Sequence, residues 1–366
     1  MATVEFGVNN PLTNQLWEAQ LNVEVIEATY FARFVGRDNQ SMIQEKEEPN
    51  KSAGDRVTCG LRGILTADGK QGNEVLEGDE EAFSTFDDQL FVDELRHAVS
   101  VPAGATIDAQ RVPYDLRAEG YDAMKQWYAD RLDEAMFNQL CGYTPATSTK
   151  RTGQQAVIAP STNNIIRANN RASDDLLVAG DEITLAHIDA LKERAATMRQ
   201  ANGQPIIRPF MIMGEPYYVL FIHDYQETDL RRDAGSIGIG WLQLQRDALQ
   251  GGAITGNPLF TGALGVYNNV ILHKSTRTTQ GVDGTVATTP ITTARRAVFC
   301  GAQAAWVAWG QSYGVSAFRW VERLTDYQKA LGIAASSVWG LKKSRFRSVD
   351  FATIVLSTYA VAHGGA

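Results

Sequence analysis

The fold of this chain is most constrained by a polar segment interrupted by glycines, which is followed by a long amphipathic helix. Residues 54 to 101 contain three turn signals, around Gly69, Gly72 and Gly78, separated by short apolar runs that are typical of strands. A two-stranded excursion of this size is only marginally stable alone in water. We therefore expect it to lie on another surface. A neighbouring subunit can supply that surface, in which case the chain is a building block rather than a solitary enzyme.

The helix is expected between Asp115 and Cys141. Its apolar positions recur every four residues and widen into a broad face: Met124, Tyr128, Leu132, Met136 and Leu140, with Tyr121, Trp127, Ala135 and Phe137. Gly142 stands where a C-terminal cap belongs, and Pro145 follows it. At a rise of about 1.5 Å per residue the helix spans roughly 40 Å. Such a length indicates a structural strut.

Composition excludes several classes of protein. A net charge of -8 argues against a protein that binds nucleic acid mainly through a basic face. DNA can still lie against a locally neutral or basic surface. For the one basic run, Lys342 to Arg347, a solvated patch or a subunit contact is favoured over phosphate binding. Three distant cysteines predict no disulfide framework. The longest weakly polar run, residues 297 to 310, is too short to span a bilayer, and no export signal is apparent, so we expect a cytoplasmic protein.

The remaining pattern mixes helices and strands without a βαβ repeat, which favours the α+β class. Helices are expected at residues 14–35 and 184–201, and strands at 206–213, 217–223, 266–273 and 348–359. Residues 144–173 are expected to form a long ordered loop or a crossing between domains. Residues 295–311, rich in small side chains and containing two tryptophans, are expected to be buried, either as a strand or as a tightly packed helix.

One constellation invites a catalytic interpretation. His223 and Asp224, with His187 upstream and Asp229 or Asp233 downstream, are the residue types that a metal-dependent phosphohydrolase needs. A strand end with polar tips explains the same residues more simply, and we favour it.

The stretch from Gly63 to Lys70 has the wrong glycine spacing for a phosphate loop. No catalytic, cofactor or metal site is therefore predicted.

An ordered set of short motifs resembles the major capsid proteins of tailed bacteriophages, in the family typified by coliphage N-four. The motifs are Phe34-Val35-Gly36, Gly54-Asp55-Arg56-Val57, Gly72, Leu76 to Glu81, Arg96-His97-Ala98-Val99, Gln110-Arg111, Asp115-Leu116-Arg117, Trp127 to Gly142, Val219 to Leu230, Asn257 to Phe260, and Gly262 to Gly265. The resemblance covers most of the chain and is densest before Gly142.

The resemblance implies the Johnson fold, also called the Hong Kong 97-type capsid fold. It implies an N-terminal arm (1–40), an extended loop (41–110), the spine helix of a peripheral domain (111–145), a mainly axial domain with some peripheral strands (146–315), and a return to the peripheral domain (316–366). In the extended loop, the implied assembly residues are Gly54, Asp55, Gly69, Lys70, Gly72, Leu76, Glu77, Gly78, Glu80 and Glu81. On the spine helix they are Asp115, Met124, Trp127, Leu132 and Met136.

On this interpretation the chain assembles with itself into the pentamers and hexamers of an icosahedral head shell. The shell encloses double-stranded DNA, with portal, scaffolding and decoration proteins as partners and no membrane. The virion is assembled in the host cytoplasm. The acidic loop is expected to meet basic residues of a neighbour, Arg345 and Arg347 among them. Some family members cross-link a lysine to an asparagine, and Lys70 is the candidate here. The alternatives are the phosphohydrolase-like enzyme and an encapsulin-like compartment shell.

Overall fold

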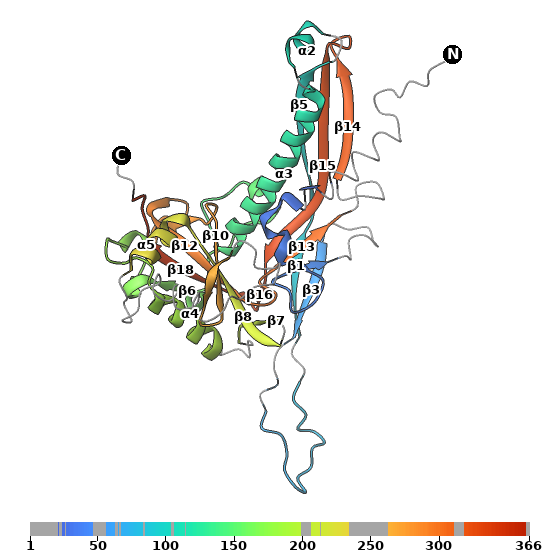
Figure 1. The fold of residues 1–366 in the computed structure, drawn as a ribbon. Coiled ribbons are helices and arrows are strands. Elements are labelled where there is room, and N and C mark those ends of the chain that lie inside the picture. Colours follow the sequence, from blue (N-terminus) through green and yellow to red (C-terminus); the bar gives the residue numbers. More distant parts are fainter. Residues whose placement is uncertain are drawn as a thin grey trace.

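The computed structural model describes most of the chain between residues 21 and 363. The description leaves out residues 1–20, 22–23, 26, 47–55, 63–64, 66, 83–84, 104–105, 114, 199–205, 213, 234–262, 311–317 and 364–366. The molecule is elongated: a compact body carries a long, narrow arm on one side, and a loop extends in the opposite direction (Figure 1).

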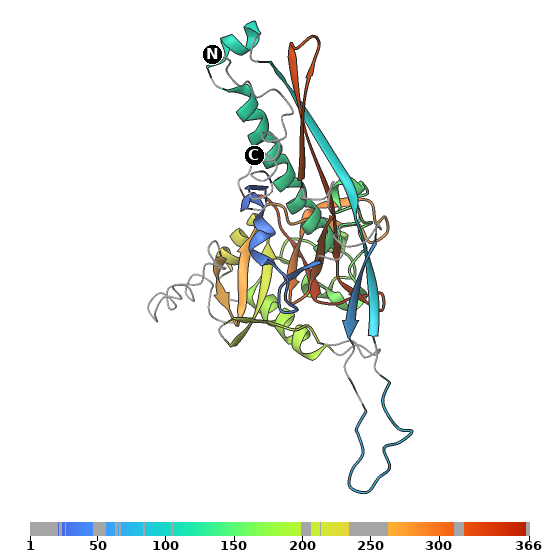
Figure 2. The same ribbon diagram turned by 90° about the vertical axis from the view of Figure 1, so that its right-hand side faces the viewer.

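The arm is built on one long central strand, β15 (Ala330–Lys343). Strand β5 (Asp93–Pro102) pairs antiparallel with residues 330–339 of β15. On the other side, β14 (Phe318–Thr325) pairs with residues 330–337 and β13 (Ala305–Trp309) with residues 339–343. The sheet continues from β13 to β2 (Ile43–Lys46) and β1 (Val35–Gly36). Figure 2 shows how far the β14–β15 hairpin and β5 project from the body.

Helix α3 (Leu116–Leu140) runs along this sheet and is the predicted strut. Asp115 is its N-cap, with a side-chain oxygen that accepts a hydrogen bond from the Arg117 N–H, and Cys141 ends it. The Tyr128 hydroxyl lies 3.1 Å from the Leu95 carbonyl oxygen and 2.7 Å from that of Ala335, so it joins the helix to both β5 and β15. The predicted helix is confirmed with its caps, and the short helix α2 (Ile107–Arg111) precedes it.

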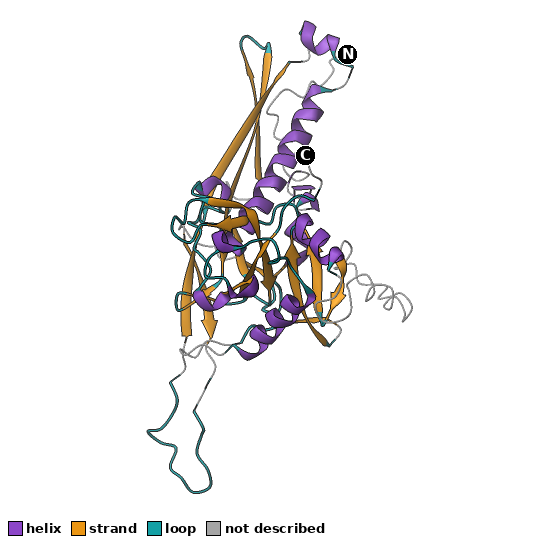
Figure 3. Cartoon of the chain, turned by 90° about the vertical axis from the view of Figure 1, so that its left-hand side faces the viewer, coloured by secondary structure: helices purple, strands orange, loops and turns teal. Residues whose placement is uncertain are grey.

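The body contains a second, mostly antiparallel sheet. Its strands follow the order β6 (Ile165–Arg167), β18 (Thr353–Tyr359), β12 (Pro290–Cys300), β8 (Glu215–Ile222), β10 (Val270–Lys274) and β9 (Ala263–Tyr267), with β11 (Gln280–Val282) on β12 and β7 (Phe210–Ile212) on β8. Helices α4 (Leu185–Thr197) and α5 (Asp224–Arg232) belong to this body (Figure 1), and Figure 3 distinguishes the helices from the strands by colour. Two large sheets, two two-stranded ribbons and a few helices, with no repeated βαβ pattern among the described residues, confirm the α+β class.

Short elements complete the fold. The two-residue strands β16 (Arg345–Phe346) and β17 (Val349–Asp350) form a small hairpin. Single turns of 3₁₀ helix occur at Thr149–Arg151, Thr162–Asn164, Ala168–Asn170 and Asp174–Leu176. They lie in and just after the 144–173 segment, which is otherwise loop apart from β6, as predicted.

A fifth 3₁₀ element, η1 (Tyr30–Phe34), packs where the arm meets the body. The N–H groups of Tyr30 and Phe31 donate to the two carboxylate oxygens of Asp133 on α3, at 3.1 and 3.3 Å. The Phe31 ring lies 4.7 Å from that of Phe137 on α3 and 5.3 Å from that of Phe221 on β8. One short segment near the N-terminus therefore ties the spine helix to the second sheet.

Several predicted elements need correction. The helix expected at residues 14–35 lies partly outside the described residues, and its end is wrong because Tyr30–Phe34 is 3₁₀ helix and Val35–Gly36 is strand. The strand expected at 266–273 is a hairpin of β9 and β10. Its turn residues, Asn268 and Asn269, have φ angles of 48° and 59°, in the left-handed region that asparagine tolerates. Residues 93–101, expected to belong to an unsupported excursion, form β5 and pair with β15 of the same chain.

Gly340 on β15 packs directly against the backbone at the junction of β4 and β5. A Cβ atom there would lie 1.9 Å from the Phe91 carbonyl oxygen, whereas a Cβ at Gly332 on the same strand would lie 3.4 Å from its nearest neighbour, the Arg323 oxygen. We expect Gly340→Ala to lower the free energy of unfolding by about 3 kcal/mol or more, because backbone atoms must move apart. Gly332→Ala is the matched control. Urea denaturation measures both, and equal stabilities would contradict the close approach.

His273 on β10 is a fully buried histidine in an aromatic cluster. Its ring lies 5.2 Å from that of Phe34 and 5.9 Å from that of Phe221, and neither ring nitrogen has a hydrogen-bond partner among the described residues. Burial, aided by the charge of Arg33, lowers the pKa of His273 from 6.5 to about 4.

The folded state therefore resists protonation of His273 while the unfolded chain takes up the proton below pH 6.5. The stability that the neutral ring provides is present above that pH and is lost as pH falls toward 4. We expect His273→Leu to be more stable than the wild type by about 1 kcal/mol at pH 7 and by more at pH 4.5. Exposed His97→Gln is the control. A difference that does not grow between the two pH values in urea melts would contradict this role.

Candidate assembly site

The extended loop begins as a two-stranded ribbon of β3 (Arg56–Arg62) and β4 (Thr85–Phe91). Val57, Cys59 and Leu90 are buried, so the ribbon packs against its own chain. Lys342 on β15 donates to the Asp88 carboxylate at 2.5 Å and to the Gln89 carbonyl oxygen at 3.0 Å. The base of the excursion is therefore anchored in the molecule, in contrast to the unsupported hairpin that the sequence predicts.

Beyond the ribbon, residues 65–82 form a loop that extends away from α3 and the body (Figures 1 and 2). All its described residues are exposed, including Val75 at 72% and Leu76 at 58%. Gly69, Gly72 and Gly78 have φ angles of 75°, 64° and 95°, which confirms the three turns. Gly54 and Asp55 lie outside the described residues.

The contacts described for this loop join the loop to itself. Lys70 pairs with Asp79 at 2.5 Å, the Ala67 N–H donates to Glu81 at 2.8 Å, and the Gly78 N–H donates to Glu80 at 3.0 Å. Six acidic residues and one lysine give residues 65–82 a net charge of -5. The loop thus keeps its shape through local bonds while it presents exposed apolar side chains and negative charge to the outside.

The predicted spine-helix residues divide into two groups. Met124, Leu132 and Met136 are buried and hold α3 against the sheet, while Asp115 caps it. Trp127 is half-buried on the outer side, where its ring stacks on that of His97 with centroids 4.2 Å apart and planes 15° apart. The Arg131 guanidinium lies 5.3 Å from the centre of the same indole ring. Trp127 therefore lies at the edge of the core, with part of its ring exposed.

The basic run near residue 342 is not a solvated patch. Lys343 is buried, with Nζ lying 2.9 and 3.0 Å from the two carboxylate oxygens of Asp350, and burial lowers the pKa of this lysine. Arg345 faces the same carboxylate at 3.5 Å. Part of the Arg345 charge therefore faces a carboxylate of its own chain, and the pairing of Arg345 and Arg347 with a neighbour's acidic loop stays a prediction. The sequence pattern gives no sign that one lysine of the run is internal.

Three of the five residues of the phosphohydrolase interpretation lie at the starts of helices, while Asp229 lies within α5 and Asp233 at its end. His223 is the N-cap of α5, where its Nδ1 accepts a hydrogen bond from the Tyr225 N–H at 3.1 Å, and Asp224 begins the helix. His187 Nδ1 accepts from the Thr184 N–H at the start of α4. Burial lowers the pKa of both histidines, that of His223 to about 4. Within the described residues no group of three or more His, Cys, Asp or Glu side chains is placed to hold a metal ion.

Comparisons with known proteins decide the family. A family profile described as phage capsid protein matches residues 5–362. The chain belongs to this family. The major capsid protein of Pseudomonas phage KPP25 is 28% identical over 92% of each chain. The solved capsid of Ralstonia phage GP4 is 29% identical, covers 100% of both chains and superposes with a TM-score of 0.79.

A more distant neighbour agrees in fold. The capsid of cyanophage Pam1 is 17% identical over 92% of this chain and 93% of that one, with a TM-score of 0.68. The chain therefore has the Hong Kong 97-type capsid fold and is a structural protein of a phage head shell, not an enzyme. The phosphohydrolase and compartment-shell alternatives gain no support from these matches. No helix among the described residues has the length and apolarity to cross a membrane.

Proposed function

We propose that this capsid protein closes its shell by laying the 65–82 loop of each copy on a neighbouring copy. The observation that carries the proposal is the loop itself, which is exposed along its described length, locally bonded and directed away from its own body. Exposed apolar residues on a projecting element indicate an interaction site. Repetition around a closed shell then multiplies each weak contact.

The domain roles follow the same proposal. Residues 1–40 act as the N-terminal arm, 41–110 as the extended loop and 111–145 as the spine helix. Residues 146–315 meet their copies around the capsomer axes, and 316–366 return to the peripheral domain. The hydrogen bonds from the Tyr30 and Phe31 N–H groups to Asp133 support an N-terminal arm (residues 1–40) that is anchored on the spine helix.

The partners in this proposal are those of a tailed-phage head. Pentamers and hexamers of the chain enclose packaged double-stranded DNA on the inner face, and portal, scaffolding and decoration proteins complete the particle in the host cytoplasm. The net charge of -8 is consistent with DNA that is confined by the shell rather than gripped by it. Membership of the branch typified by coliphage N-four stays a prediction, supported by the ordered motifs of the sequence.

Expression of the chain alone tests self-assembly. We expect capsomers, tubes or shells in electron micrographs and fast-sedimenting species in an ultracentrifuge. A stable monomer at high concentration, with residues 65–82 resistant to protease, would contradict the proposal, because the loop would then be protected within its own chain.

A further inference from the structure

A polar groove lies between the start of β5, the outer side of α3 and the 3₁₀ turn Thr149–Arg151. It has a volume of about 580 Å³, within the range of sites that hold small ligands or a few residues of a peptide. Its floor is the stacked pair of His97 and Trp127, and its basic residues are Arg96, Arg131, Lys150 and Arg151. We call this site the β5–α3 groove.

The groove carries more positive than negative charge. Four cationic residues line it against two acids, Asp93 and Glu94. Arg131 and Arg151 both pair with Glu134, at 2.9 and 2.7 Å, and Arg131 also lies over the indole ring of Trp127. Lys150 has no ion pair among the described residues, and the 3.9 Å pair of Arg96 with Glu94 is exposed and therefore weak. Lys150 and Arg96 are therefore the two cationic side chains of the groove that can pair with acidic residues of a partner.

The end of the 65–82 loop has complementary chemistry. Val75 and Leu76 are the exposed apolar pair, and Glu74 and Glu77 flank them directly. An aliphatic pair matches an aromatic floor, and two flanking carboxylates match a basic rim. The loop of the same copy extends away from α3, so a second copy must supply it (Figure 2).

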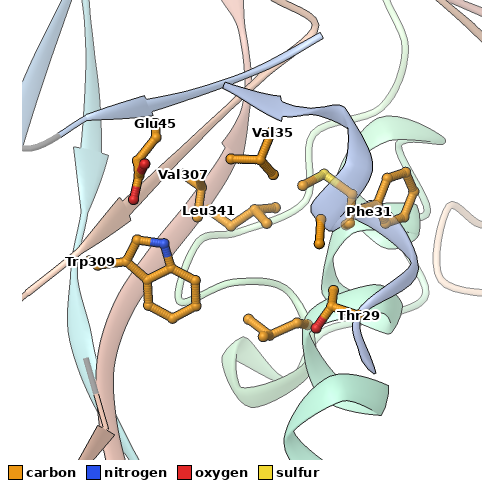
Figure 4. Close-up of a pocket in the computed structure, with 10 residues that line it drawn as sticks. Thr29, Phe31, Val35, Glu45, Val307, Trp309 and Leu341 are labelled. Carbon is orange, nitrogen blue, oxygen red and sulfur yellow. The ribbon is translucent and has the colours of Figure 1, made fainter. Parts of the chain in front are cut away.

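A second cavity in the chain fits this loop less well. It has a volume of about 220 Å³ between η1, α3 and the long sheet, and its lining is apolar apart from Thr29 and Glu45 (Figure 4). Among the described residues that line it, Glu45 is the only charged one. Burial of Val75 and Leu76 there would bring Glu74 and Glu77 toward a like charge, which is unfavourable in a partly dehydrated contact.

We propose that the β5–α3 groove of one copy binds the Glu74–Glu77 segment of a neighbouring copy. The inference rests on the proposed function, in which the loop lies on a neighbour, and it names the receiving surface. Lys150 and Arg96 pair with the two glutamates, and Trp127 contacts the aliphatic pair. The contact differs from the one that the sequence suggests, because Arg345 faces Asp350 of its own chain.

A charge-swap experiment tests the pairing. We expect Arg96→Glu with Lys150→Glu to lower the yield of shells at least about tenfold, and Glu74→Lys with Glu77→Lys to do the same, because each places like charges together. The variant that combines all four changes should recover assembly. Lys192→Glu with Arg194→Glu, a matched reversal on α4, serves as the control. If either double variant assembles normally, or if the variant with all four changes stays defective, the inference is overturned.

A binding measurement separates this inference from the proposed function. A fluorescent peptide of residues 67–82 is added to the full chain, and to the chain with Arg96→Glu and Lys150→Glu. We expect the reversed groove to bind at least about tenfold more weakly, and binding to the wild type to weaken with added salt. Equal binding by both proteins, or none by either, removes the groove as the receptor even if shells form. If shells do not form but the peptide distinguishes the two proteins, the fault lies in the proposed function.

Discussion

A chain in which residues 65–82 are replaced by a two-residue Asn-Gly turn should fold normally and fail to form shells. The replaced residues bond to each other, and the β3–β4 ribbon beneath them is anchored independently through Lys342. The free energy of unfolding should therefore change by less than about 1 kcal/mol, as for surface substitutions away from core features. The inter-copy contact, by contrast, is removed at every position of the shell.

Two measurements check this expectation together. Circular dichroism during urea denaturation reports folding, and sedimentation with electron microscopy reports assembly. A same-length Gly/Ser replacement should also fail to assemble, since it keeps the reach of the loop but removes its carboxylates and its apolar pair. Shells of normal yield from the shortened chain would refute the loop's role. A large loss of stability would show instead that the loop belongs to the chain's own core.

The parts of the fold that the sequence predicts well are those that are specified locally. Helix α3 has apolar residues at helical spacing over 25 residues, with Asp115 before it and Gly142 after it, so both its existence and its ends are correct. Gly69, Gly72 and Gly78 mark turns because their positive φ angles suit glycine above other residues. The capsid family follows from an ordered set of such local motifs.

The parts that sequence reasoning missed depend on partners far away in the chain. Strand β5 pairs with β15, more than 200 residues later, as in the Ala330–Pro102 register, so nothing near Asp93 indicates that it is supported. The β5–α3 groove likewise joins His97, Trp127 and Lys150 from three separate segments. One missed feature did have a local signal: Asn268-Asn269 is a turn dipeptide in the middle of the run that we expected to be a single strand.

The buried ion pair of Lys343 and Asp350 should be among the most sensitive positions in the chain. Both side chains are 1% exposed, and the Lys343 ammonium also donates to the Ile158 carbonyl oxygen at 3.1 Å. The Asp350 carboxylate accepts from the Ser161 N–H at 3.1 Å. The pair therefore joins the end of β15 to the loop around residue 160 and to the β16–β17 hairpin.

Asp350→Ala should lower the free energy of unfolding by about 3–5 kcal/mol, because it leaves a buried ammonium group without its carboxylate. The neighbouring variant Asp88→Ala is the matched control: it removes the partner of Lys342, whose pair is more exposed at 17% and 12%, and should cost about 1 kcal/mol. Replacing both charges, as Lys343→Met with Asp350→Leu, should restore much of the loss, since two apolar groups need no partner. Equal urea midpoints for Asp350→Ala and Asp88→Ala would mean that water reaches Lys343, and the pair would then be an ordinary surface contact rather than the bond that fixes the base of the arm.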